Sequence, residues 1–194
     1  MKQFLAYSVF LFLIFTTNSF AQNACVPEAE EAYKKVYALV DKAKSFSKNG
    51  DYVQEKKYAQ EAVNLSQNIQ EKYKCFSPVA YWELSNACSN LSDFAGALKY
   101  ATNADQFCET FKMIGCQCKS TSTFKIGTIY LAMGNDSMAV LEYKKAFDLC
   151  EKDGNKYMEA FILQSKGDID KKNNNIELAL NEYSTAEEIV RSIG

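Results

Sequence analysis

A pair of small side chains recurs along this chain at a fixed spacing, and the recurrence limits the folds open to it. A small residue is followed twelve positions later by alanine, and the pattern returns roughly every 42 residues. The copies are Ala43 to Glu55, which is a decayed form, Ser85 to Ala97, Gly127 to Ala139 and Gly167 to Ala179. Another alanine follows seven positions after each copy: Ala62, Ala104, Ala146 and Ala186. Small side chains at these offsets let two antiparallel helices approach closely, and stacked pairs of this kind build a solenoid.

Breaks between the helices fall at the same interval. They lie at Asn49-Gly50-Asp51, Ser92-Asp93-Phe94, Gly134-Asn135-Asp136 and Asn174-Asn175-Ile176. The corresponding residues Gly50, Ser92, Gly134 and Asn174 follow one another at a nearly constant spacing. Between the breaks apolar residues recur at helical spacing, and one helix is predicted from about Tyr52 to Lys74. Strand-like alternation is missing and the chain has only two prolines, so we expect an all-α fold.

Residues in one repeat match a known family. The stretch from Thr123 to Ala146 resembles the tetratricopeptide repeat at its small, aromatic, turn-glycine, alanine, aromatic and alanine positions: Gly127, Tyr130, Gly134, Ala139, Tyr143 and Ala146. Stretches from Leu39, Tyr81 and Leu163 keep part of this pattern in register. The resemblance implies a right-handed superhelical solenoid of about four helical hairpins, roughly 28–74, 77–114, 119–154 and 157–193. The period exceeds the length of about 34 residues that is usual in the family, which indicates a variety with long helices.

Residues 1–21 have the character of a secretory signal peptide. Lys2 precedes an apolar run from Phe4 to Phe15, and Ser19-Phe20-Ala21 forms a small-x-small cleavage site. The apolar run is too short to span a bilayer, which disfavours an uncleaved anchor. A lipid anchor at Cys25 is also disfavoured, because the aliphatic residue expected three positions before it is missing. We therefore expect an exported chain, periplasmic or secreted, with residues 22–194 as its helical domain and no membrane span after cleavage.

Composition argues against several functions. The chain has 22 Lys and Arg against 24 Asp and Glu, so nothing favours nucleic acid as a partner. It has no histidine, which removes the commonest general base and metal ligand. Phosphate-binding glycine loops and nucleophile elbows are also missing. We expect a non-enzymatic protein without a cofactor or a metal site.

In tetratricopeptide proteins the first helix of each repeat lines a concave groove that receives a segment of a partner protein. Carried over by register, the groove residues are Tyr37, Val40, Lys44, Trp82, Asn86, Phe124, Thr128, Gln164 and Asp168. Trp82 beside Phe124 would offer an aromatic anchor of the kind found in binding hot spots. The alternative is that both rings pack between helices. Lys44 and Asn86 alone suit a groove that grips a terminal carboxylate, so we disfavour that specificity.

Disulfides are the default in an oxidising compartment. The candidates are Cys25, Cys75, Cys108, Cys116, Cys118 and Cys150. Cys108 is expected to pair with Cys116 or Cys118, the remaining one with Cys150, and Cys25 with Cys75. Cys88 falls in a helix-packing position and is expected to stay a buried thiol. A redox-active or zinc-binding Cys116/Cys118 pair is the sharper alternative.

The leading hypothesis is an exported adaptor that binds a protein or peptide segment in its groove. A structural or sensory assembly module of a larger envelope or signalling complex is the second hypothesis, and a thiol-redox protein is the third. The last helix carries Ala186, Ile189, Val190 and Ile193. A solenoid end of this kind leaves an apolar side uncovered. Either another subunit or partner covers it, or the apolar strip is small enough to tolerate; self-association through that helix is the prediction.

Overall fold

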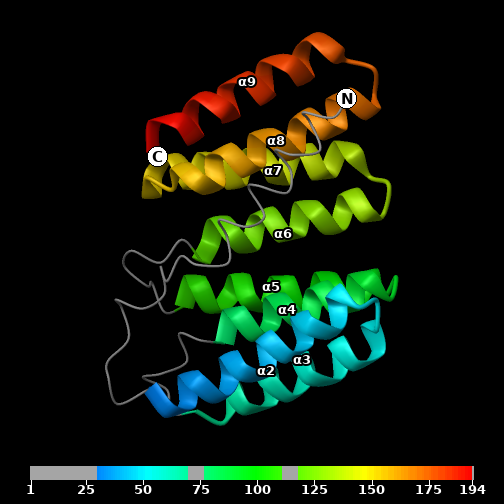
Figure 1. Cartoon of the computed structure of the whole chain (residues 1–194), viewed down its shortest axis with the longest axis vertical. Coiled ribbons are helices and arrows are strands. Elements are labelled where there is room, and N and C mark those ends of the chain that lie inside the picture. The colour runs from blue at the N-terminus through cyan, green and yellow to red at the C-terminus, as the bar shows by residue number, and fades with distance from the viewer. Residues whose placement is uncertain (1–29, 70–76, 111–117, 194) are drawn as a thin grey trace.

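The computed structural model describes residues 30–69, 77–110 and 118–193. The expected signal peptide at 1–21, together with Cys25, Cys75 and Cys116, lies outside these residues. Within them the chain forms eight helices and no strand (Figure 1). The helices are α2 (Glu30–Lys48), α3 (Tyr52–Gln67), α4 (Ser77–Asn90), α5 (Phe94–Thr110), α6 (Cys118–Ala132), α7 (Asp136–Asp153), α8 (Lys156–Lys172) and α9 (Ile176–Ile193).

Each helical hairpin turns through the same backbone conformation. One residue per turn has a left-handed backbone: Gly50 (φ 76), Ser92 (φ 59), Gly134 (φ 77) and Asn174 (φ 63). The amide of the next residue donates to the carbonyl five positions back in every turn: Asp51 to Phe46, Asp93 to Cys88, Asn135 to Tyr130 and Asn175 to Asp170. This bond closes the C-terminus of the first helix. The sequence spacing therefore located all four turns.

In three hairpins the second helix begins directly after the turn, because a side chain of the turn caps its N-terminus. The carboxylate of Asp51 accepts a hydrogen bond from the amide of Gln54 at 3.1 Å. Asn135 accepts from the amide of Met138 at 3.1 Å in the same way, and Asp93 accepts from Gly96 at 3.0 Å. Such caps satisfy amides that have no partner inside the helix.

The third and fourth hairpins are held close by a glycine opposite a tyrosine. A Cβ atom added at Gly127 would lie 2.6 Å from the Tyr143 ring, and one added at Gly167 would lie 2.6 Å from the Tyr183 ring. In the second hairpin the small residue is Ser85, whose hydroxyl donates to the carbonyl of Ala97 at 2.8 Å. The small residues that recur in the sequence are therefore the places where paired helices touch.

One predicted boundary is wrong. Helix α3 ends at Gln67, whereas periodicity predicted a helix that continues to Lys74. The Asn68 amide donates to the Leu65 carbonyl at 3.2 Å, and its side chain donates to the Asn64 carbonyl at 2.8 Å. These two bonds satisfy carbonyls that a further helical turn would have used, and so they end the helix.

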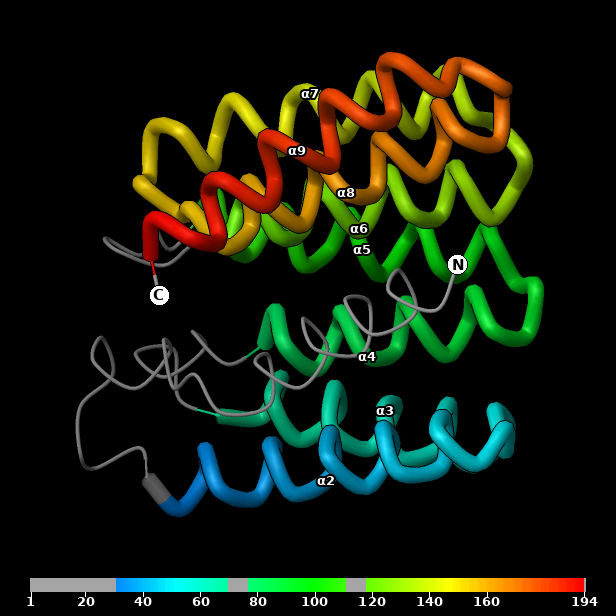
Figure 2. Tube along the Cα trace, turned by 45° about the horizontal axis from the view of Figure 1, so that its top comes forward, coloured from blue at the N-terminus to red at the C-terminus, as the bar shows by residue number. Residues whose placement is uncertain are grey.

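The hairpins stack in chain order, with α2 and α3 at one end and α8 and α9 at the other (Figure 1); Figure 2 shows the same trace turned by 45°. Each helix contacts the next along the chain, and in addition α2 contacts α4, α4 contacts α6 and α6 contacts α8. Buried alanines fill the contacts, with Ala43, Ala59, Ala62, Ala97 and Ala104 all at 0% exposure. None of the helices in the described residues combines the length and apolar character that crossing a bilayer requires.

Candidate functional site

The first helices of the four hairpins share one face of the solenoid. Neighbouring first helices contact one another, whereas the second helices make at most marginal contact with each other in the described residues. In a curved stack of repeats, the helices that approach most closely lie on the inner side. We call the face formed by α2, α4, α6 and α8 the inner groove.

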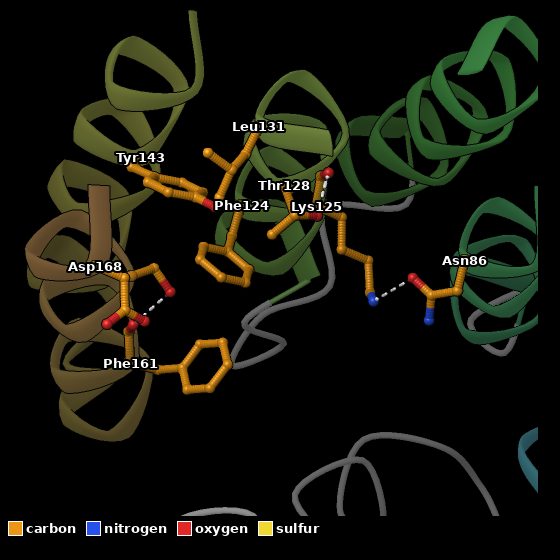
Figure 3. A pocket seen from close by; sticks show the side chains of 9 residues that line it. Asn86, Phe124, Lys125, Thr128, Leu131, Tyr143, Phe161 and Asp168 are labelled. Carbon is orange, nitrogen blue, oxygen red and sulfur yellow. Dashed lines mark hydrogen bonds between the residues drawn. The ribbon is translucent and has the colours of Figure 1, made fainter. Parts of the chain in front are cut away.

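A pocket of about 390 Å³ opens on the inner groove between α4, α6 and α8 (Figure 3). Its lining residues are Asn86, Phe124, Lys125, Thr128, Leu131, Tyr143, Phe161, Ser165 and Asp168. The volume falls at the lower end of the range typical of ligand pockets. It is therefore suited to a single side chain or a similarly small group.

Aromatic rings form the floor of this pocket. The Phe124 ring stacks on the ring of Tyr143 with centroids 5.0 Å apart, and it meets Phe161 edge-on at 5.2 Å. Phe124 and Tyr143 are 7% and 1% exposed, so core packing fixes their orientation. The pocket is consequently a preformed apolar surface that lacks rotamer freedom at its base.

Polar groups of opposite charge stand on the two sides of Phe124 (Figure 3). On the α4 side, the Lys125 ammonium donates to the Asn86 amide oxygen at 3.1 Å. On the α8 side, the Asp168 carboxylate accepts from the Tyr183 hydroxyl at 2.7 Å. Each charged group is thus oriented by a neighbour from another helix.

A buried carboxyl group lies next to the pocket on α4. Glu83 is 4% exposed, and burial raises the pKa of its carboxyl to about 7, against the lowering effect of Lys44 and Lys125. Burial also lowers the pKa of Lys125, while Glu83 acts in the opposite sense. The two lysines and Glu83 therefore form one electrostatic unit that spans α2, α4 and α6.

Four of the nine residues expected in the groove line this pocket: Asn86, Phe124, Thr128 and Asp168. Two others lie on α2, further along the solenoid. Tyr37 is half-buried with its ring 4.3 Å from the ring of Tyr33. Lys44 is exposed, and its ammonium lies 4.0 Å from the Asp41 carboxylate. These positions are compatible with a longer groove, and the role of the residues in binding stays a prediction.

The remaining three expected residues are not available at the pocket. Val40 is 0% exposed and packs in the core, so its assignment to the groove surface is wrong. Trp82 is partly buried, and its indole N–H donates to the Ser122 hydroxyl of α6 at 2.8 Å. Gln164 is half-buried with an unpaired buried amide oxygen. The tryptophan therefore packs between helices, in agreement with the alternative interpretation.

Sequence reasoning missed five residues of the pocket lining: Lys125, Leu131, Tyr143, Phe161 and Ser165. Lys125 and Ser165 directly follow the expected groove residues Phe124 and Gln164 along the chain. A signal was present, because Glu83 and Lys125 are one period apart and so share one repeat position. Opposite charges at an equivalent position of adjacent repeats could have marked it as facing the groove.

The described cysteines follow the predicted pattern in part. Cys108 at the end of α5 is bonded to Cys118 at the start of α6, which is one of the two predicted pairings, and Cys88 is a free buried thiol as expected. Cys150 is also free, so its predicted bridge is wrong. It lies in the core at 0% exposure, and burial raises the pKa of its thiol to about 11.

These cysteines offer little to thiol or metal chemistry. Cys118, one of the two cysteines considered for redox chemistry or zinc binding, is bonded to Cys108. Among the residues that the structure describes, no group of three or more Cys, Asp or Glu side chains is arranged to hold a metal ion. Burial also raises the pKa of the Cys88 thiol, which disfavours the reactive thiolate.

Comparison with known proteins shows the fold. No protein-family model and no curated protein matches the sequence. The crystal structure of the apo form of RapI has a TM-score of 0.65 and 14% identity, over 82% of this chain and 57% of RapI. BtubC from P. vanneervenii has a TM-score of 0.64 and 12% identity, over 91% of this chain and 75% of BtubC. MamA has a TM-score of 0.52 and 16% identity, over 84% of this chain and 83% of MamA.

The chain thus spans little more than half the length of RapI. These neighbours are helical-repeat proteins with a TPR-like fold. The likeness confirms the all-α fold class, a right-handed superhelical solenoid of helical hairpins. At 12–16% sequence identity, this structural similarity supports the fold and nothing further.

Proposed function

We propose that this chain is an exported, non-enzymatic module that binds a segment of a partner polypeptide in the inner groove. The observation that carries the proposal is the preformed pocket across α4, α6 and α8, with an aromatic floor and charged sides. Aromatic anchors surrounded by polar groups are the usual content of binding hot spots. The TPR-like fold supports the same role at a coarser level, because such solenoids present extended concave binding surfaces.

The proposed binding mode uses the long-repeat variety of the tetratricopeptide family, with a period of about 42 residues. A partner segment would lie along the first helices and place one side chain in the pocket. Lys125, Asn86 and Asp168 would supply hydrogen bonds to the polar groups of that segment. No step of covalent chemistry is needed for this role.

Photo-cross-linking tests the location of the binding surface. A photoreactive phenylalanine analogue placed at Thr128, which lines the pocket, is expected to capture a partner from the native compartment. The matched control carries the same analogue at Lys144, an exposed position on α7 outside the pocket. Equal capture from both positions, or capture from Lys144 alone, would place binding elsewhere and refute the groove.

Export to the periplasm or the outside is a separate part of the proposal. It is supported by the signal-like character of residues 1–21 and by the Cys108–Cys118 disulfide, since disulfides persist in oxidising compartments. Cell fractionation of the full chain, followed by N-terminal sequencing, is expected to find a mature protein that begins at Gln22. A full-length protein in the cytosolic fraction would contradict this part alone.

A second candidate function is assembly with further copies or with other subunits. Several large apolar side chains are exposed on the second helices and at the turns, between 37% and 67%: Tyr52, Val53, Leu91, Met133, Val140, Leu141, Ile176, Leu178 and Leu180. On α9 the residues expected to drive self-association, Ile189 and Val190, pack against a buried cluster. Leu178 and Leu180 are both 56% exposed, and they are the better candidates.

Sedimentation at high concentration tests this second candidate. Replacing Leu178 and Leu180 together by glutamate is expected to abolish any dimer, because two charges would have to be buried in the contact. A wild-type chain that sediments as a strict monomer would count against self-association.

A further inference from the structure

The pocket in the inner groove combines an apolar floor with two unlike charges. We propose that it selects a partner segment in which one large apolar side chain is flanked by an acidic residue on the α4 side and a basic residue on the α8 side. This inference rests on the proposed groove function and adds to it the chemistry of the partner.

The apolar part of the proposal follows from the floor. Phe124 is held between Tyr143 at 5.0 Å and Phe161 at 5.2 Å, and Leu131 completes the lining. A preformed apolar cavity gains most from a group that fills it, because its walls are already ordered. A volume of about 390 Å³ accommodates one leucine, methionine or aromatic side chain and the backbone that carries it.

The α4 side favours an anion. The Lys125 ammonium is held at the pocket by the Asn86 oxygen, 3.1 Å away, so a ligand carboxylate would meet an oriented donor. Lys44 lies further along the groove, 4.0 Å from the Asp41 carboxylate, so Lys125 is the cation that lines the pocket on this side. Its hydrogen-bond partner there, Asn86, is a neutral amide. An incoming carboxylate would therefore meet a positive group on the α4 side.

The α8 side favours a cation. Asp168 receives a neutral hydroxyl, that of Tyr183 at 2.7 Å, which orients the carboxylate and leaves its charge in place. The nearby lysines of α8 are engaged elsewhere: Lys166 pairs with Glu182 at 2.5 Å, and Lys172 pairs with Asp136 at 2.9 Å. The negative charge of Asp168 is consequently uncompensated at the pocket, and it is exposed to an incoming ligand.

The proposed order is spatial, so the inference holds for a segment that runs along the groove in either chain direction. What distinguishes it is composition: one acid and one base on opposite sides of the apolar residue. Peptides with two acids or with two bases would each place one like charge against the pocket, and like charges repel. Exposed charge pairs of this kind are expected to change affinity by about twofold to fivefold, with the larger effect at low salt.

Selection from a random library of short displayed peptides tests the inference without a known partner. The wild-type protein is expected to enrich peptides with an acid and a base on opposite sides of a large apolar residue. A Lys125→Glu variant makes both sides acidic and is expected to enrich two bases, whereas Asp168→Lys is expected to enrich two acids. Synthetic peptides of each class then give Kd values, with alanine in place of the apolar residue as the peptide control.

Matched variants separate charge effects from loss of structure. Lys144→Glu and Asp148→Lys make the same charge changes on exposed positions of α7 and are expected to keep the wild-type preference. If Lys125→Glu prevents folding because it places a second acid near Glu83, Lys125→Gln replaces it in the experiment. Lys125→Gln is expected to lose only the preference for an acidic residue in the peptide. Circular dichroism verifies that each variant is folded.

The outcomes divide cleanly between the two proposals. The charge inference is overturned, and the groove function kept, if two results occur together. The Lys125 and Asp168 variants enrich the same peptides as the wild type, and these peptides no longer bind a Thr128→Trp variant, in which the larger side chain fills the pocket. Peptides that bind equally well to the Thr128→Trp variant, or no enrichment at all, would overturn both.

Discussion

Gly127 and Tyr143 give the sharpest test of how the hairpins are packed. A Cβ atom at position 127 would lie 2.6 Å from ring carbons of Tyr143 and 3.3 Å from the carbonyl oxygen of Ala139. Tyr143 is 1% exposed and stacked on Phe124, so the ring cannot move aside freely. Gly→Ala inside a helix ordinarily stabilises by about 0.5–1 kcal/mol. Here we expect Gly127→Ala to destabilise by about 1–3 kcal/mol through overpacking.

The chain itself contains the compensated arrangement. Where the first helix carries a Cβ, at Ala43 and Ser85, the residue sixteen positions later is alanine; where it carries Gly127 or Gly167, that residue is tyrosine. Tyr143→Ala alone is expected to cost about 3–5 kcal/mol, because it removes a buried ring. The double variant Gly127→Ala/Tyr143→Ala should be no less stable than Tyr143→Ala. The coupling energy is then about 2 kcal/mol, in the range found for residues in contact.

Urea unfolding followed by circular dichroism, with the disulfide intact, measures all four corners of this cycle. Gly167→Ala is the internal comparison, since its Cβ would also lie 2.6 Å from a tyrosine ring. Tyr183 is only half-buried and can move toward solvent, so the cost there should be smaller. Additive single effects at 127 and 143, or a Gly127→Ala protein more stable than wild type, would refute the close-packing argument.

Three further perturbations have expected outcomes. Because burial raises the Glu83 pKa from 4.5 to about 7, its contribution to stability is fully present below about pH 4.5 and is lost as the pH rises through 7. The free energy of unfolding of the wild type should therefore fall by up to about 3 kcal/mol over this range relative to Glu83→Gln. Thermal melts of both proteins from pH 4 to 8 measure this, and the same pH dependence in both would contradict it. Cys108→Ala/Cys118→Ala removes the disulfide and should cost about 2–4 kcal/mol in urea unfolding; an unchanged midpoint would show that the bond does not constrain the chain. Ser92→Gly should stabilise by about 0.5–1 kcal/mol, because its φ of 59 is strained for a residue with a Cβ, and a lower melting temperature would argue against that strain.

The sequence determined the local parts of this protein. Each turn needs a left-handed residue, three of the four turns follow it with a side-chain cap, and each hairpin needs small residues at set offsets. The residue types themselves meet these requirements: Gly50 and Gly134 adopt the left-handed conformation, and Asn135 caps the helix that follows. Such signals are read within a few residues of the chain, which is why the turns, the pairing of helices and the fold class were predictable.

Tertiary packing decided which side chains reach the groove. Successive residues of a helix point about 100° apart, so a small rotation of α6 or α8 exchanges one lining residue for the next. That rotation is set by contacts across repeats, such as the bond from Trp82 to Ser122, which belong to different hairpins. Packing of the same kind buries Val40 in the core and places Lys125 at the pocket. The choice of Cys118 as the partner of Cys108 likewise depends on how α5 meets α6 in space, and no spacing along the sequence contains that orientation.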